Sequence, residues 1–510
     1  MEGNTSLLYQ NEDCHTLYNC DSLFTDLHMD SIIAAVTEGL DEFNLQQYYL
    51  ERPVRRSDAE FRVSVAENIR EEDIRNKLEA FHIGLSKTRS FLTIADSVSE
   101  APAKGKWKLD AASEYVRAVS ALCGGWNKAA QSEGLNRFLT WLRIYVESDE
   151  FTNLKAKTES LEISANNIVY SLRLDINNNI VYFGDDSGCG DICAEFIQTF
   201  DRYNLNDIKR DITAFADIHM NVLEKKILSI VQTEHPDLLL SLSAFCAGND
   251  RFIHEKIAAF ERETMFYISY GKFVSALEDK GFAFTLPRFS GNNSLHISGG
   301  YDISLALVKD DVNLIVENDF DLTDGEHNFL LTGPNQGGKT TFSRMLGQVL
   351  LLSSLGLSVP CRDAEILWTN GLETHFNIEE KPGGDSGRLQ DELLRLNRIL
   401  SSTPQKSVVI LNELFSSTTT YDAMEMGRRV LQMFEDKECV CLYVTHLFEL
   451  AKIGDAVSLI AETSEDLTPT YKISRNPSGG NAYAGRLLAK HRLRKADIKE
   501  RIHAALTALL

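Results

Sequence analysis

The spacing of apolar residues predicts a mainly helical first part of the chain. From about residue 28 to 158 they recur every three or four positions, as in MDSIIAAVTEGLDEF and LNRFLTWLRIYVES. This spacing is typical of amphipathic helices. The stretch APAKGKWK at 101–108 interrupts the pattern with turn-forming residues. We therefore expect helices on both sides of a break at 101–108.

A short β segment is predicted between two helical stretches. NIVYSLRLDINNNIVYFGDD alternates polar with β-branched or aromatic residues, and its asparagines at 177–179 suit the turn of a hairpin. Helical spacing returns in AEFIQTFDRYNLNDIKRDI and in FIHEKIAAFERETMFYISYGKFVSALEDKG. The pattern predicts a helical region over 61–158 and 191–283, with a β-hairpin insertion at 159–190.

From about Phe284 to the C-terminus, strands and helices are expected to alternate. The segments ISLALV, VNLIVEN and NFLLTG are predicted as short strands. The apolar runs FLLTG, SVVILNE, CLYVTH and AVSLIAE are then separated by helical segments, which indicates a mainly parallel sheet covered on both faces. The chain is therefore predicted to be multidomain, with an α/β domain over 284–510.

Composition limits the classes of function. With 43% hydrophobic and 25% charged residues, the chain is typical of globular proteins. Its net charge of -22 argues against a surface that binds phosphate indiscriminately, so any nucleic-acid contact is expected to be local. We find no apolar stretch long enough to span a membrane and no signal peptide, so we expect a cytoplasmic protein.

The nine cysteines are predicted to be reduced thiols. Cys189 and Cys193 form the closest pair, but they lack a second Cys or His pair, so we interpret them as loop thiols rather than metal ligands. Cys439 and Cys441 alternate in the apolar run CVCLYVT and are expected in the core.

The segment GPNQGGKT fits the phosphate-binding pattern G-x-x-x-x-G-K-[ST] between a predicted strand and a predicted helix. Its glycines let backbone N–H groups turn towards phosphate oxygens, and the N-terminus of the next helix favours an anion. Lys339 is predicted to reach the β and γ phosphates, and Thr340 to offer its hydroxyl to Mg²⁺. The alternative is a glycine-rich turn that holds a lysine by chance. The predicted nucleotide-binding residues are Gly333, Pro334, Asn335, Gln336, Gly337, Gly338, Lys339, Thr340 and Thr341.

Three more residues are candidates for the chemistry of hydrolysis. SVVILNELF ends a predicted strand in Asn412 and Glu413. Glu413 is predicted to position or activate water, and Asn412 to hold the metal through a water. CLYVTH ends a further strand in His446, which is predicted to contact the γ-phosphate or the attacking water. A carboxylate with no catalytic role at the strand end, and a capping or core histidine, are the alternatives.

Three segments, TGPNQGGKTT, LNELFSSTTTYDA and YVTHLFEL, resemble the MutS family of DNA mismatch-repair ATPases. That family's motifs read TGPN-x-GGK-[ST]-T, DE-x-x-x-x-T-[ST]-T-x-D-[GA] and TH-x-x-EL. The resemblance also places Asn318 of VENDFDL at an adenine-contacting asparagine and Tyr483 at a C-terminal tyrosine. It implies an ABC-like, MutS-type P-loop NTPase domain over 284–510 that ends in a helical dimerisation segment. Residues 1–60 then lead into a helical core and lever.

The chain also departs from the family pattern. Asn412 replaces an aspartate, and Phe415, Ser416 and Ser417 replace a Gly-Arg-Gly run. DSGRLQDELLRLNRIL retains Ser386, Gly387, Arg388 and Glu392 but lacks the family's Ser-Thr-Phe, which puts communication between paired sites in doubt. The Phe-x-Glu wedge of mismatch-reading members is absent, so we expect little or no preference for mismatches.

By resemblance, we expect a slow Mg²⁺-dependent ATPase, a homodimer that opens and closes as a clamp on duplex, mismatched or branched DNA. A repair protein is a further expected partner. The hairpin at 159–190 is either a reduced DNA clamp or a plain structural hairpin. The alternative function is a nucleotide-dependent scaffold that binds a protein partner and no DNA, which the net charge of -22 favours.

Overall fold

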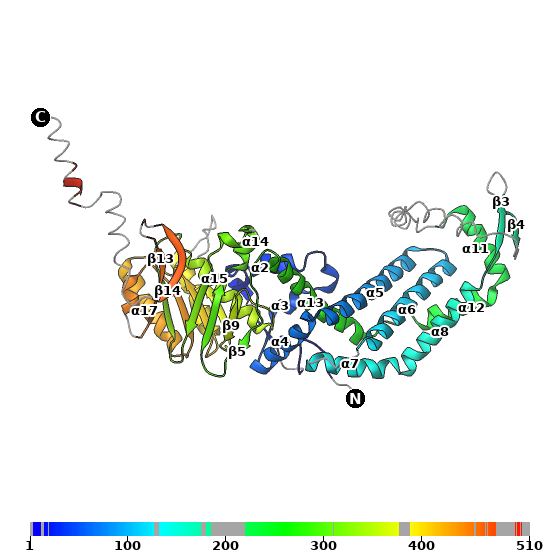
Figure 1. The fold of residues 1–510 in the computed structure, drawn as a ribbon, viewed down its shortest axis with the longest axis horizontal. Coiled ribbons are helices and arrows are strands. Elements are labelled where there is room, and N and C mark those ends of the chain that lie inside the picture. Colours follow the sequence, from blue (N-terminus) through cyan, green and yellow to red (C-terminus); the bar gives the residue numbers. More distant parts are fainter. Residues whose placement is uncertain are drawn as a thin grey trace. The chain divides into compact units, whose positions relative to one another are not determined.

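The chain forms two compact units, each described separately. The computed structural model (Figure 1) describes residues 4–11, 15–18, 20–126, 132–174, 180–184, 220–309, 311–376, 388–452, 455–464, 466, 468–475, 495, 497–499 and 501. The first unit comprises Met1–Glu71, Gln131–Leu135 and Arg262–Leu510, and the second comprises Glu72–Ala130 and Asn136–Glu261. Two helices, α7 (Glu133–Val146) and α13 (Glu255–Glu278), contribute residues to both units.

The second unit is mainly helical. Helices α5 and α6 run side by side (Figure 1), and their backbones approach closely, since a Cβ atom added to Gly84 would lie 2.6 Å from Ala118 Cβ. Aromatic rings fill its interior, where Phe138 stacks on Phe260 with ring centroids 3.4 Å apart. Its helices are α5 (Glu72–Ser97), α6 (Ala101–Gly124), α8 (Asp149–Asn166), α11 (Val222–Glu234) and α12 (Pro236–Gly248).

The predicted break at 101–108 is wrong. Helix α6 begins at Ala101, so APAKGKWK forms its first two turns. Pro102 lies at the start of this helix, where its fixed φ and missing N–H cost nothing. The break between α5 and α6 falls instead at 98–100.

Two strands follow α8. Strand β3 (Ser171–Leu174) pairs antiparallel with β4 (Ile180–Gly184), in agreement with the alternating pattern. The predicted turn at 177–179 and the pair Cys189 and Cys193 lie outside the described residues.

The first unit contains a six-stranded sheet in the order β10-β11-β12-β8-β13-β14. All neighbours are parallel except β14, which is antiparallel to β13, so the predicted parallel sheet is confirmed. Every residue of β11 and β12 is buried, which requires cover on both faces. The strands are β8 (Asn328–Thr332), β10 (Leu372–His375), β11 (Val408–Asn412), β12 (Val440–Val444), β13 (Val457–Thr463) and β14 (Pro469–Arg475).

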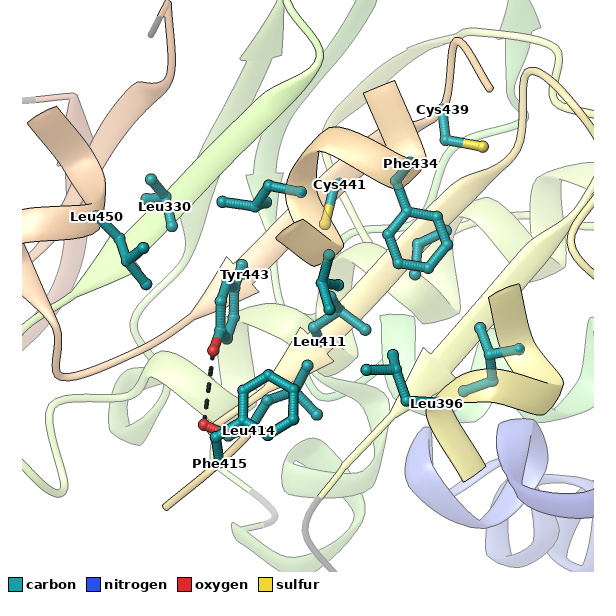
Figure 2. Close-up of a cluster of buried hydrophobic side chains, with 14 of the residues drawn as sticks. Leu330, Leu396, Leu411, Leu414, Phe415, Phe434, Cys439, Cys441, Tyr443 and Leu450 are labelled. Carbon is teal, nitrogen blue, oxygen red and sulfur yellow. Dashed lines mark hydrogen bonds between the residues drawn. The ribbon is translucent and has the colours of Figure 1, made fainter. Parts of the chain in front are cut away.

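Helices pack against this sheet and enclose its core. They are α15 (Lys339–Ser354), α16 (Arg388–Ser402), α17 (Thr420–Glu435) and the 3-10 helix η3 (Phe448–Lys452). Figure 2 shows one buried cluster, in which Leu411 and Tyr443 of the strands meet Leu396 of α16 and Phe434 of α17. Cys439 and Cys441 are fully buried there as predicted, and the described thiols at 123, 246, 361, 439 and 441 are free.

A second, four-stranded sheet has the order β5-β9-β6-β7. Its strands are β5 (Arg288–Phe289), β6 (Leu295–Gly300), β7 (Asn318–Leu322) and β9 (Asp363–Ile366). The strand predicted at ISLALV is wrong, because these residues form helix α14 (Ile303–Lys309). Asp302 Oδ1 accepts the Ser304 N–H at 2.9 Å, which favours the start of a helix. VNLIVEN likewise begins as the 3-10 turn η2 (Val312–Leu314), and the strand starts only at Asn318.

The N-terminal residues complete the first unit. They form β1 (His15–Leu17), α1 (Cys20–Asp26), α2 (Met29–Val36), η1 (Asp41–Phe43), α3 (Gln46–Leu50), β2 (Glu51–Pro53) and α4 (Arg56–Arg70). Asp26 joins α1 to the large sheet, because its Oδ2 accepts from Thr374 Oγ1 at 2.8 Å and from Arg395 Nη2 at 2.5 Å.

Candidate functional site

The glycine-rich loop connects the C-terminal end of β8 to the N-terminus of α15. Gly333 has a φ of 143°, and a Cβ atom there would lie 2.7 Å from Ala461 Cβ, so only glycine fits. Gly338 caps α15 with a φ of 88°. The backbone therefore curves around the first turn of a helix, as phosphate binding requires.

Lys339 lies in the curve of this loop. Its Nζ donates to Gly333 O at 3.2 Å and to Pro334 O at 2.9 Å, and the residue is only 4% exposed. Burial lowers the pKa of this ammonium, and Glu413 opposes that shift. An anion in the loop would therefore relieve the cost of burying the lysine charge.

Thr340 faces the end of β11. Its Oγ1 lies 3.5 Å from Asn412 Oδ1, and Asn412 is buried. Hydroxyl and amide oxygens are ligands that Mg²⁺ accepts, directly or through water. Both residues fit a metal beside bound phosphates, but this pair brings no carboxylate.

Glu413 and His446 lie at the ends of neighbouring parallel strands. The register pairs Asn412 of β11 with Val444 of β12, so the residues that follow meet at one edge of the sheet. His446 Nε2 lies 3.2 Å from Glu413 Oε1. The hydrogen bond with His446 lowers the pKa of the Glu413 carboxyl, partial burial opposes this, and Lys339 adds to the lowering. Glu413 is therefore ionised at neutral pH.

These residues surround a cavity of about 600 Å³. Its wall includes loop and helix residues 335–342, Asn318, Glu413 and His446. Of the predicted residues, Gly333, Pro334 and Asn412 do not line the cavity; they lie behind its wall, in contact with Lys339 or Thr340. The remaining predicted site residues, from Asn335 to Thr341 with Asn318, Glu413 and His446, are brought together around it.

Asn318 lines the cavity but uses its amide elsewhere. Its Nδ2 donates to Val316 O at 3.2 Å and Tyr471 O at 3.0 Å, and its Oδ1 accepts from Ile473 N at 2.7 Å. In this geometry Asn318 joins β7 to β14, and its side chain borders the cavity without a hydrogen bond directed into it.

Several residues that line the cavity are not predicted from the sequence, among them Tyr471, Leu305 and Lys309. Tyr471 comes from β14, and Leu305 and Lys309 come from α14. Leu305 and Lys309 are four residues apart and share one face of α14, whereas the strand predicted at ISLALV ends at Val308, before Lys309. Tyr471 has a φ of 60° but no local sequence motif that indicates a site.

Some predictions lie outside the described residues. These are Ser386, Gly387 and Tyr483, together with the side chain of Arg388. Over the ranges that the structure does describe, no group of three His, Cys, Asp or Glu side chains is placed to hold a metal ion. Within the same ranges, every helix is too short or too polar to cross a membrane.

Comparison with known proteins finds a family match over the region of the large sheet. The family described as MutS domain V matches residues 329–476. The chain is 29% identical over 171 residues to the DNA mismatch repair protein MutS of Rickettsia prowazekii, a match that covers 33% of this chain and 19% of the relative. It is 31% identical over 150 residues to the DNA mismatch repair protein MSH2 of Saccharomyces cerevisiae, covering 29% of this chain and 16% of that protein. The aligned region thus spans about a fifth of these relatives.

Proposed function

We propose that this chain, a MutS-family protein in its domain V, binds MgATP in the cavity beside the glycine-rich loop and hydrolyses it slowly. One observation carries the proposal: Lys339, Glu413 and His446 come from three separate elements and converge on one cavity of about 600 Å³. A P-loop NTPase domain of the ABC-like, MutS type requires this convergence of a phosphate-binding lysine with a carboxylate that positions water.

Each residue has a specific role in this proposal. The loop N–H groups and Lys339 hold the phosphates, and Lys339 exchanges its contacts with Gly333 O and Pro334 O for phosphate oxygens. The ionised Glu413 orients a water for attack on the γ-phosphate, and a hydrogen bond with His446 fixes the orientation of that carboxylate. Thr340 and Asn412 would hold Mg²⁺, the latter through water. A bound Mg²⁺ supplies positive charge to the phosphates.

Relatives named as DNA mismatch repair proteins favour DNA as the ligand that ATP controls. We propose a homodimer that opens and closes on duplex, mismatched or branched DNA and that acts in the cytoplasm, with a repair protein as a second partner. A clamp can surround duplex DNA through a few phosphate contacts without reading bases. The helical unit over 72–130 and 136–261 then corresponds to the lever part of the molecule.

A second candidate function rests on charge. A net charge of -22 disfavours nonspecific DNA binding and favours a nucleotide-dependent scaffold for a protein partner. Fluorescence anisotropy with homoduplex, single-mismatch and branched DNA, with and without ATP and over a salt series, separates the two. Salt-sensitive binding that responds to ATP supports the DNA clamp. ATP hydrolysis without binding to any of these DNAs supports the scaffold.

Two solution measurements test the rest of the proposal. Phosphate release in MgATP measures hydrolysis directly, and absence of phosphate release contradicts the ATPase function. Molecular mass by light scattering, with and without ATP, measures the oligomeric state. A monomer under both conditions contradicts the homodimer.

A further inference from the structure

The turn that carries Glu413 has an unfavourable backbone conformation. Glu413 has a φ of 55° and Phe415 a φ of 62°, which places both in the left-handed region. Residues with a Cβ atom are disfavoured there, and a bulky aromatic residue is a genuine outlier. The surrounding structure must therefore hold this turn in place.

Hydrogen bonds with neighbouring elements hold the turn. The Glu413 N–H donates to Val444 O at 2.9 Å, and the Phe415 N–H donates to Glu392 Oε1 at 3.2 Å. The Tyr443 hydroxyl donates to Leu414 O at 3.5 Å, the dashed contact in Figure 2. The last contact is long and therefore weak. The shorter side-chain contact is the one from the Phe415 N–H, at the end of the turn, to the Glu392 carboxylate.

Glu392 occupies a position where the helix pattern favours an apolar residue. On α16, Leu389, Leu396 and Ile399 pack against the buried cluster, and Glu392 lies on the same face at helical spacing. The residue is only 7% exposed. A carboxylate is costly at such a site unless it accepts hydrogen bonds, and the Phe415 N–H supplies one.

We propose that Glu392 is a positioning residue for the candidate ATPase site. Its carboxylate holds the Phe415 N–H, keeps the turn left-handed, and so directs the Glu413 carboxylate towards His446 and the cavity. This inference rests on the proposed function, in which Glu413 orients water. It makes α16 the element whose position determines whether Glu413 is aligned.

Steady-state ATP hydrolysis by full-length variants tests the inference. Glu392→Leu keeps the volume but loses the acceptor, and we expect kcat to fall about tenfold or more with KM and ATP affinity within about twofold. Glu392→Gln retains an amide oxygen for the Phe415 N–H, so it should keep kcat within about threefold. Asp391→Asn, an exposed neighbour on α16, is the matched control and should leave both constants unchanged.

A second substitution separates positioning from general stability. Glycine adopts left-handed backbone freely, so in a Phe415→Gly background the loss of kcat caused by Glu392→Leu should shrink. If Glu392→Leu does not fold, Glu392→Asp shortens the reach to the Phe415 N–H and should still lower kcat about threefold or more.

The outcomes are distinct. The positioning role is overturned if Glu392→Leu has the wild-type kcat. If the leucine variant does not fold, a wild-type kcat in Glu392→Asp overturns it instead. An equal loss of kcat in Glu392→Leu and Glu392→Gln also overturns it. When wild type hydrolyses ATP and Glu413→Gln does not, the proposed function stands, and a result against the positioning role of Glu392 removes only this inference. If wild type itself does not hydrolyse ATP, the proposed function and this inference fail together.

Discussion

His446 Nε2 lies 3.2 Å from Glu413 Oε1, across the ends of two neighbouring parallel strands. The His446 side chain is about half exposed and the Glu413 side chain about one-third exposed, so solvent reaches both. Because this hydrogen bond lowers the pKa of Glu413, the carboxylate is ionised at neutral pH, which the proposed role in orienting water requires.

The first prediction concerns Glu413. Glu413→Gln keeps the size of the side chain and removes its charge, so we expect hydrolysis to fall about 100-fold or more while ATP affinity stays within about threefold. Phosphate release and calorimetry measure the two quantities. His446→Ala should show a smaller loss of hydrolysis, since it removes the group that orients the carboxylate. Hydrolysis at the wild-type rate in Glu413→Gln would contradict the assignment.

The second prediction concerns Lys339. Lys339→Ala removes the buried ammonium from the loop, and we expect ATP to bind about tenfold or more weakly. Lys406 is a suitable control because it is exposed and pairs with Glu438. Lys406→Ala should bind ATP as wild type does. Equal affinity in Lys339→Ala and wild type, measured by calorimetry, would show that the loop does not hold phosphate.

Sequence patterns predicted the parts of the site that are local in the chain. Strands β8, β11 and β12 are continuous apolar runs, and a buried parallel strand requires such a run. Glu413 and His446 follow two of these runs, so their meeting at one sheet edge follows from the parallel register.

The remaining features depend on contacts between distant segments. ISLALV is a short apolar run, which periodicity alone cannot assign to helix or strand, and the structure makes it α14. The role of Asn318 as a link to β14 depends on Tyr471 and Ile473, more than 150 residues away in the chain. The left-handed φ of Phe415 contradicts its local preference, so only the folded surroundings explain it.

The third prediction is a pH effect on stability from Glu263 of α13. Its Oε2 accepts from the Leu7 N–H at 2.6 Å and its Oε1 from Ser6 Oγ at 2.9 Å, and only 6% of the residue is exposed. Burial raises the pKa of Glu263 from 4.5 to about 7, against these hydrogen bonds and the nearby Arg62 and Arg262. Between about pH 4.5 and 7, Glu263 is therefore protonated in the folded chain and ionised in the unfolded chain.

This stabilisation is complete below pH 4.5 and is lost as the pH rises through about 7. At roughly 1.4 kcal/mol for each pKa unit, it amounts to at most about 3.5 kcal/mol. We expect Tm to fall between about pH 4.5 and 7, and Glu263→Gln to flatten that fall. Glu255→Gln changes an exposed glutamate of the same helix and should keep the wild-type slope. An unchanged slope in Glu263→Gln would contradict the prediction.

The fourth prediction concerns Asn412, the buried amide that faces Thr340 Oγ1 at 3.5 Å. Mg²⁺ prefers charged oxygen ligands, and an aspartate is expected here from the family pattern. An amide keeps the shape and one acceptor but lacks the charge. The wild-type chain should therefore bind ATP, require a raised Mg²⁺ concentration for hydrolysis, and dwell in its ATP-bound state.

Asn412→Asp restores the carboxylate and should lower the Mg²⁺ concentration for half-maximal hydrolysis about tenfold. Without Mg²⁺ the same variant should be less stable than wild type, because a buried carboxylate then lacks its cation. Asn293→Asp places the same change at an exposed site and should alter neither property. A Mg²⁺ titration of phosphate release and a melting curve with and without EDTA measure the two effects. If the Mg²⁺ dependence of Asn412→Asp matches that of wild type, Asn412 does not hold the metal and only closes the end of β11.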